Sequence, residues 1–260
     1  MDSNAGIEGL LRTILALPTV ELRVRSLRES FAAPPELQGA ALDGICAAAL
    51  QGDTRAREVM LPLALSLAQL ADWDGAGEHP DRRKLRELAE RRAWWALERL
   101  LRSAPSSEPL SAPELAVPDY GAGRELTVGE RRSLARRPPR AQIERLLQDP
   151  HPLVVEQLLA SPQMTEADVL RLASRRPPHR PGLRILSGSL RWLTRPRVRL
   201  ALVLQPTCPV EVTVPLLHVC GRRELSSVVR DPALPPLLRS TARELLERSP
   251  PWGPPAAPLQ

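Results

Sequence analysis

The side chains best suited to chemistry in this chain are its three cysteines and four histidines. Cys208, His218 and Cys220 lie near one another in the sequence, and thiolate and imidazole are the ligands that Zn²⁺ prefers in proteins. A structural zinc site needs about four ligands at constrained spacing, and the sequence supplies no fourth ligand here. We therefore expect these cysteines to be small apolar residues buried in helices.

The sequence lacks the serine elbow of hydrolases, glycine-rich phosphate loops and the HExxH motif of metalloproteases. Glu166 and Asp168 form an acidic pair, but Thr165 and Asp168 have the spacing of a capping box at a helix N-terminus. We therefore expect a protein that is not an enzyme and that binds no cofactor or metal ion.

Arginine doublets recur near the expected ends of helices. One interpretation is that these cations offset the helix dipole and are otherwise solvated. The other is that equivalent positions in a stack of repeats form a basic ribbon, with Trp192 between Arg191 and Arg195 as the place for a nucleic-acid contact. The candidate partner-binding residues are therefore Arg136, Arg137, Arg175, Arg176, Arg191, Trp192, Arg195, Arg222 and Arg223.

These side chains are positioned by helices whose ends are marked by a recurring sequence motif. The motif consists of two aliphatic residues, one or two polar residues and a proline. It occurs at residues 146–150, 158–162, 203–206 and 228–232. A proline disfavours the α conformation in the residue before it and cannot donate a hydrogen bond inside a helix, so each copy should end a helix. Between two copies, Val154/Leu158 and Val155/Leu159 are i,i+4 pairs on one face.

Helices this short are marginal alone in water, so their apolar faces must pack on neighbouring helices. The prolines at positions 138, 162, 206 and 232 are separated by 24, 44 and 26 residues, and 44 is twice 22. A period of this size is typical of solenoids and repeat arrays. The sequence therefore predicts an all-α fold with an α-solenoid in the second half.

The segments from Asp149 to Pro162 and from Arg195 to Pro206 resemble the leucine-rich repeat variant, a relative of HEAT-type repeats. The resemblance covers about residues 131–249 and implies a right-handed solenoid of short helices. Some members of that family carry an iron–sulfur cluster on a separate cysteine-rich segment. This chain lacks such a segment, so the resemblance implies no cluster here.

The first half also reads as helical, with helices expected at residues 6–17, 20–31, 36–50, from 53 onward and 81–102. Antiparallel pairs of this kind fit either HEAT-like units or a compact bundle. Trp94 and Trp95 lie about 100° apart around a helix, so we expect one in the core and one at its rim. The expected domains are a helical domain at 1–103, a linker at 104–130, a repeat domain at 131–249 and a disordered proline-rich tail at 250–260.

The charge of the chain is unevenly distributed. Residues 1–119 carry a net charge of −4 and residues 120–260 one of +10, which together give +6. All of the 36 basic residues except Lys84 are arginine, and with 29 prolines this suggests a GC-rich, bacterial genome. The basic half suits nucleic acid, an anionic membrane, an acidic protein or the acidic half of the same chain.

The N-terminus lacks the basic region of a signal peptide, and no uncharged apolar run approaches the ~18 residues of a membrane span. The sequence therefore predicts a cytoplasmic scaffold or adaptor that binds another protein. The alternative is nucleic-acid binding through a basic face. The HEAT-like repeats of some alkylpurine DNA glycosylases suggest a repair protein in that case.

Overall fold

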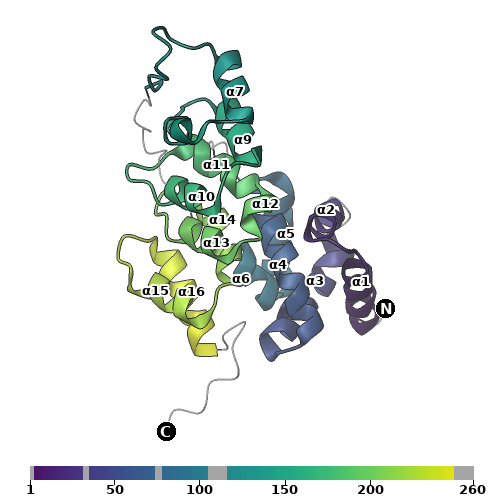
Figure 1. Cartoon of the computed structure of the whole chain (residues 1–260). Coiled ribbons are helices and arrows are strands. Elements are labelled where there is room, and N and C mark those ends of the chain that lie inside the picture. The colour runs from purple at the N-terminus through teal and green to yellow at the C-terminus, as the bar shows by residue number, and fades with distance from the viewer. Residues whose placement is uncertain (1–2, 32–34, 74–77, 105–115, 249–260) are drawn as a thin grey trace. The chain divides into compact units, whose positions relative to one another are not determined.

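Figure 1 shows a computed structural model of the chain, which describes residues 3–31, 35–73, 78–104 and 116–248. Sixteen α-helices and one short 3-10 helix make up its regular structure, and no strand occurs among these residues. The predicted all-α class is therefore confirmed. Among the helices described, none combines the length and apolar character needed to cross a membrane.

By its packing the chain divides into two compact units, which differ from the expected domains. The terminal unit combines the described residues of Met1–Glu108 with those of Pro209–Gln260, and the middle unit lies within Pro109–Cys208. The expected repeat domain at 131–249 is thus split at residue 208, and the helices beyond it join the N-terminal part. Most of the expected linker core, 105–115, and the tail at 250–260 lie outside the described residues.

The terminal unit is built from nine helices of the described chain. They are α1 (Ser3–Leu15), α2 (Val20–Phe31), α3 (Pro35–Gln51), α4 (Thr54–Ala68), α5 (Pro80–Arg92), α6 (Trp95–Leu101), α14 (Val210–Leu217), α15 (Arg222–Arg230) and α16 (Pro236–Arg248). The first four begin and end within a few residues of the predicted positions. Asp53, where the fourth helix was expected to begin, is its N-cap, because its Oδ1 accepts a hydrogen bond of 2.7 Å from the Ala56 N–H.

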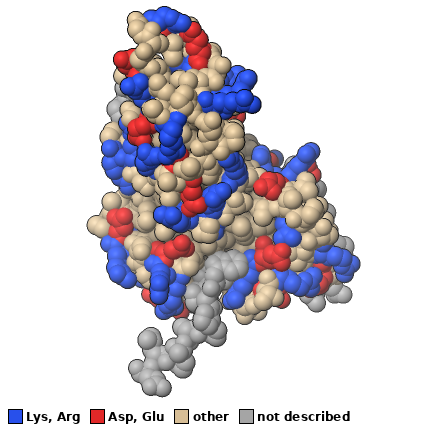
Figure 2. Space-filling view, viewed as in Figure 1, with Lys and Arg blue, Asp and Glu red and all other residues tan. Residues whose placement is uncertain are grey.

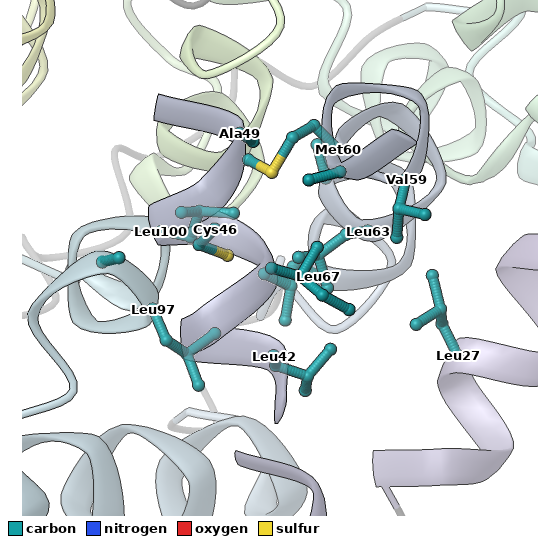
Figure 3. Packing of buried hydrophobic residues seen from close by; sticks show 14 of the residues in the cluster. Leu27, Leu42, Cys46, Ala49, Val59, Met60, Leu63, Leu67, Leu97 and Leu100 are labelled. Carbon is teal, nitrogen blue, oxygen red and sulfur yellow. The ribbon is translucent and has the colours of Figure 1, made fainter. Parts of the chain in front are cut away.

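The core of the terminal unit consists of aliphatic side chains and small residues. Figure 3 shows where α2, α3, α4 and α6 meet; the labelled side chains are Leu27, Leu42, Cys46, Ala49, Val59, Met60, Leu63, Leu67, Leu97 and Leu100. The close approach of α3 depends on Gly39, since a β-carbon there would lie 2.1 Å from Cζ3 of Trp94. Trp94 is thereby packed against the core.

Helix α14 explains why the chain after residue 208 joins the terminal unit. Its residues Val212, Thr213, Val214, Leu216 and Leu217 are at most 1% exposed, and the proline at 215 is also buried. A helix that is apolar on every side must be surrounded by other helices. It packs on α4, α6 and α16, and so it lies inside the unit rather than at the end of a stack.

The helix expected at 81–102 is wrong as a single element, because it breaks between α5 and α6. Ala93 ends α5 in the left-handed conformation with φ +55°, and Trp94 precedes α6. Asp43 of α3 then serves as a remote cap, its Oδ1 accepting hydrogen bonds of 2.9 Å from the N–H groups of Ala96 and Leu97. The break leaves Trp95 48% exposed while Trp94 packs inward, as the sequence analysis expected.

Replacing Ala93 with glycine is expected to stabilise the protein by about 0.5–1 kcal/mol, because a left-handed conformation strains an L side chain but not glycine. Ala93 is exposed, so the change creates no cavity. Urea unfolding followed by circular dichroism measures the effect. The matched variant Ala47→Gly, inside α3, should instead destabilise by about 1 kcal/mol. A loss of stability in Ala93→Gly would contradict the proposed strain.

The middle unit contains the remaining helices. They are α7 (Val128–Arg136), the 3-10 helix η1 (Arg140–Gln142), α8 (Ile143–Leu146), α9 (Pro152–Ala160), α10 (Glu166–Ala173), α11 (Arg180–Gly188), α12 (Leu190–Leu193) and α13 (Pro196–Val203). Each proline of the recurring motif lies within a few residues after the end of a helix, as predicted. The apolar face predicted for α9 is buried, since Val154, Val155, Leu158 and Leu159 are at most 2% exposed. Prolines also begin helices, at Pro152, Pro181 and Pro196.

The helices of the middle unit pack on helices two or more places along the chain. Helix α9 lies against both α7 and α11, while α10 lies against α13 (Figure 1). Helix α10 also contacts α11, and α12 joins α11 to α13. These contacts form two series, α7–α9–α11 and α10–α13, which we call rows, and α8 and α12 belong to neither row.

The segment before α7 is anchored through Tyr120. Tyr120 is 6% exposed, and its backbone oxygen accepts a hydrogen bond of 3.2 Å from Nε2 of Gln142. Thr127 and Glu130 then form a capping box that starts α7 at Val128. The linker was expected to extend to residue 130. The structure instead shows that Tyr120 is already packed in the middle unit and that α7 begins at Val128.

Candidate functional site

Trp192, the expected nucleic-acid contact, is buried with an exposed fraction of 1%. Its Nε1 donates a hydrogen bond of 2.8 Å to the Leu159 carbonyl, and the guanidinium carbons of Arg191 and Arg195 lie 4.6 and 5.3 Å from its ring centroid. The indole is thus covered and its donor is satisfied. The ring is not available for stacking on a base.

Arg191 and Arg195 have partners that explain their positions beside this tryptophan. Nη1 of Arg191 donates to the carbonyl oxygens at the C-terminal end of α9, including those of Ala160 at 2.9 Å and Ser161 at 3.0 Å. Arg195 pairs with Glu166 at 3.1 Å. Carbonyls at a helix end have no partner within the helix, so Arg191 satisfies groups that would otherwise need water.

Shortening Trp192 to phenylalanine is expected to destabilise the protein by about 2 kcal/mol, because it removes a buried hydrogen bond and part of a packed ring. Chemical denaturation measures the change in the free energy of unfolding. The matched variant Trp95→Phe, at an exposed position, should change it by less than about 0.5 kcal/mol. Equal effects in the two variants would mean that Trp192 is not the packed residue described here.

The three arginine doublets do not occupy equivalent positions. Arg136 and Arg137 are exposed at the C-terminal end of α7, in one row of the middle unit. Arg175 and Arg176 follow α10, in the other row, and Nη1 of Arg176 donates to Oε1 of Gln205 at 2.6 Å. The third pair, 222–223, begins α15 in the terminal unit. The third pair therefore lies at a helix N-terminus, whereas the first two lie at helix C-termini.

A buried polar cluster that the sequence analysis missed surrounds Asp149, which is 0% exposed. Its Oδ2 accepts hydrogen bonds from the hydroxyl of Tyr120 at 2.5 Å and from Nη1 of Arg131 at 2.7 Å. Nε2 of His179 lies 2.9 Å from the Asp149 carbonyl oxygen. Burial, together with the bond to Asp149, raises the pKa of Tyr120, and burial lowers that of His179. The cluster joins the segment before α7 to the starts of α9 and α11.

A second cluster surrounds Asp168, which the sequence analysis assigned only to a helix cap. The capping box with Thr165 is present, so that prediction is confirmed. Arg140 adds a bidentate pair at 2.6 and 2.8 Å, and Arg171 contacts the same carboxylate. Burial by itself would raise the pKa of Asp168, but the bonds from Arg140 and Thr165 hold it below its usual range. The carboxylate is therefore a structural anchor between η1 and α10.

The thiol and imidazole groups considered for a metal are buried, but they lie outside the helices in which the two cysteines were expected: Cys208 precedes α14, and His218 and Cys220 follow its last residue. Cys220 is 2% exposed and its Sγ lies 3.3 Å from the Leu216 carbonyl oxygen, one turn earlier. Cys208, 3% exposed, belongs to the middle unit, whereas His218 and Cys220 belong to the terminal unit. In the ranges that the structure covers, no group of three or more histidine, cysteine, aspartate or glutamate residues is placed to hold a metal ion.

His218 is the most perturbed titratable group of this set. It is 1% exposed, and its Nδ1 lies 3.0 Å from the Val214 carbonyl oxygen. Burial lowers the pKa of His218 to about 4, and the positive charges of Arg99 and Arg102 act in the same direction. Glu244 of α16 acts in the opposite direction and pairs with Arg102 at 2.7 Å. The imidazole is therefore neutral near pH 7 and bonds back to the last turn of α14.

Two signals in the sequence pointed to the missed clusters. Asp149, in the motif that ends with Pro150, follows the end of a helix. An aspartate in such a position can accept hydrogen bonds from backbone N–H groups, as Asp149 does from His151. Tyr120 is the single tyrosine of the chain. Neither signal identifies the arginine partners, which lie 18 and 28 residues away in the two clusters. A comparison of the chain with protein-family models, curated proteins and solved structures found no match.

Proposed function

We propose that the middle unit is a helical-repeat module that binds another protein, and that the chain acts as a scaffold or adaptor rather than as an enzyme. The observation that carries this proposal is the packing of α9 on both α7 and α11 and of α10 on α13, which places helices that are not consecutive in the chain side by side. An array of this kind presents the outer faces of successive helices side by side, which suits the binding of an extended partner. The leucine-rich-repeat-variant or HEAT-like character of the rows is part of the proposal.

Contacts that recur at a similar separation along the chain support the repeat interpretation. Side chains bond to groups 27–33 residues away along the chain, in pairs such as Arg171 with Glu144, Arg195 with Glu166 and Trp192 with Leu159. The helix starts at residues 128, 152 and 180 have similar spacings. Contacts at a nearly constant separation are what equivalent positions in neighbouring repeats would make.

A protein partner fits this unit better than a single-stranded nucleic acid does. Proteins that bind single strands stack bases on exposed aromatic side chains. The only tyrosine and tryptophan within residues 116–208 are Tyr120 and Trp192, which are 6% and 1% exposed, and phenylalanine is absent there. Duplex DNA, which needs only cations, remains a distinguishable outcome of the test.

Photo-cross-linking of the full chain in its natural cells tests the proposal. A photoreactive residue is placed at Leu153 on α9 or Arg171 on α10, both exposed in the middle unit. Leu22 on α2 is a matched control, because Leu22 and Leu153 are each 43% exposed. We expect a defined protein adduct from the middle-unit positions and none of the same mass from residue 22.

Three results would contradict the protein-binding proposal. Failure to form an adduct from any exposed middle-unit position would remove it. Identical adducts from residues 22 and 153 would indicate chance collisions. Adducts that disappear on nuclease treatment would instead support the nucleic-acid alternative.

A further inference from the structure

Most arginines of the middle unit have a partner inside the unit. Residues 109–208 hold sixteen arginines against nine aspartates and glutamates, so cations must exceed their acidic partners. Three of these carboxylates form ion pairs within the unit: Asp149 with Arg131, Asp168 with Arg140, and Glu166 with Arg195. The location of the arginines left over is therefore informative.

Three of the remaining arginines lie together on α7. Arg132, Arg136 and Arg137 are exposed and form no hydrogen bond or ion pair with any residue that the structure describes. The acidic residue of this helix, Glu130, is engaged by Arg124 and by its own cap, which lowers the pKa of Glu130 to about 2. Figure 2 shows basic side chains gathered over the α7 region of this unit.

The outer face of α7 is defined by what its inner face buries. Arg131 and Ala135 point into the unit at 5% and 0% exposure, and α9 packs on the helix. Arg132 and Arg136 are four residues apart, so they are neighbours on an exposed side that lies about 100° around the helix axis from Arg131 and Ala135. Like charges at this spacing oppose helix formation, which the helix dipole offsets only in part at its C-terminal end.

We infer that this α7 face, defined by Arg132, Arg136 and Arg137, binds a carboxylate-rich segment of the partner protein. The inference rests on the proposed function and specifies the chemistry of the partner. These guanidinium groups have no carboxylate partner within the chain. Because guanidinium is weakly hydrated, it loses little hydration free energy when it leaves water to form a bidentate pair with glutamate or aspartate. An acidic segment would also relieve the repulsion between Arg132 and Arg136. Charge complementarity of this kind sets association rate and specificity.

Charge reversal on α7 separates binding from folding. Arg132→Glu places glutamate four residues before Arg136, which is the favourable orientation for a helical ion pair, so Tm should be unchanged or higher. The probe is a fluorescein-labelled polyglutamate peptide, and its binding to the full chain is followed by fluorescence anisotropy at moderate salt, about 0.1 M. Each of Arg132→Glu and Arg136→Glu should weaken binding roughly tenfold.

Arg197→Glu is the matched control for these variants. Arg197 begins α13, is exposed and has no bonded partner among the described residues, and its reversal changes the net charge by the same amount. It should change peptide binding by less than about twofold, since surface charges act over a Debye length of about 10 Å at moderate salt. Equal weakening in all three variants would show a general effect of charge and overturn the α7 assignment.

Two further outcomes would also overturn the inference. One is that the unaltered protein does not bind polyglutamate at moderate salt. The other is that random duplex DNA binds more tightly than the peptide and depends on the same arginines, which assigns the face to nucleic acid. Cross-linking distinguishes this failure from that of the proposed function: protein adducts from residues 153 and 171, with none from a photoreactive residue at 132, retain the module but reject the α7 face.

Discussion

Replacing Asp149 with alanine destabilises the protein by about 3–5 kcal/mol, which is the largest effect we expect from a single substitution. The variant leaves the Arg131 guanidinium, which is 5% exposed, without its carboxylate, and the Tyr120 hydroxyl without its acceptor. A buried charge without a partner of opposite charge destabilises the folded state by far more than the loss of one hydrogen bond does. Urea titration followed by circular dichroism measures the change.

A control and a double variant separate the charge effect from a general loss of structure. Glu156→Ala, at an exposed position on α9, should change the free energy of unfolding by less than about 0.5 kcal/mol. Combining Asp149→Leu with Arg131→Met should destabilise less than Asp149→Ala alone, because neither charge then remains buried. A loss below about 1 kcal/mol in Asp149→Ala would contradict the burial of this ion pair.

Acidification from pH 6.5 to pH 4 should remove about 3 kcal/mol of stability through His218 alone, since its pKa is lowered to about 4 from an ordinary value of 6.5. The sign follows from proton uptake. Between these pH values the unfolded chain binds a proton at this residue and the folded protein does not, so the contribution is complete above pH 6.5 and falls with pH.

The His218→Asn variant checks this prediction, because the asparagine amide can still donate to the Val214 carbonyl that Nδ1 contacts. The variant should be less stable than the original protein at pH 7, and the difference should shrink as the pH falls toward 4. Free energies of unfolding at several pH values measure that convergence. Parallel curves for the two proteins would show that the imidazole is not held neutral by its surroundings.

Local signals in the sequence specify where most helices end. A proline constrains its own backbone and that of the preceding residue, so the stops after α8, α9, α13 and α15 follow from local chemistry. The buried stripe of α9 and the caps at Thr165 and Asp53 are equally local. The helical class was predictable for the same reason, since each of these signals acts within a few residues.

Contacts between residues and helices that are far apart in the sequence depend on the whole tertiary structure. Arg131 reaches an aspartate 18 residues away, Asp43 caps a helix 53 residues later, and α14 packs into the unit that the N-terminal helices form. The arginine pairs looked alike in the sequence, yet one is exposed on α7, one follows α10 and one begins another helix in the other unit. Such pairings depend on which faces bury the most apolar surface across the whole chain, and that balance has no signature within a single turn of helix.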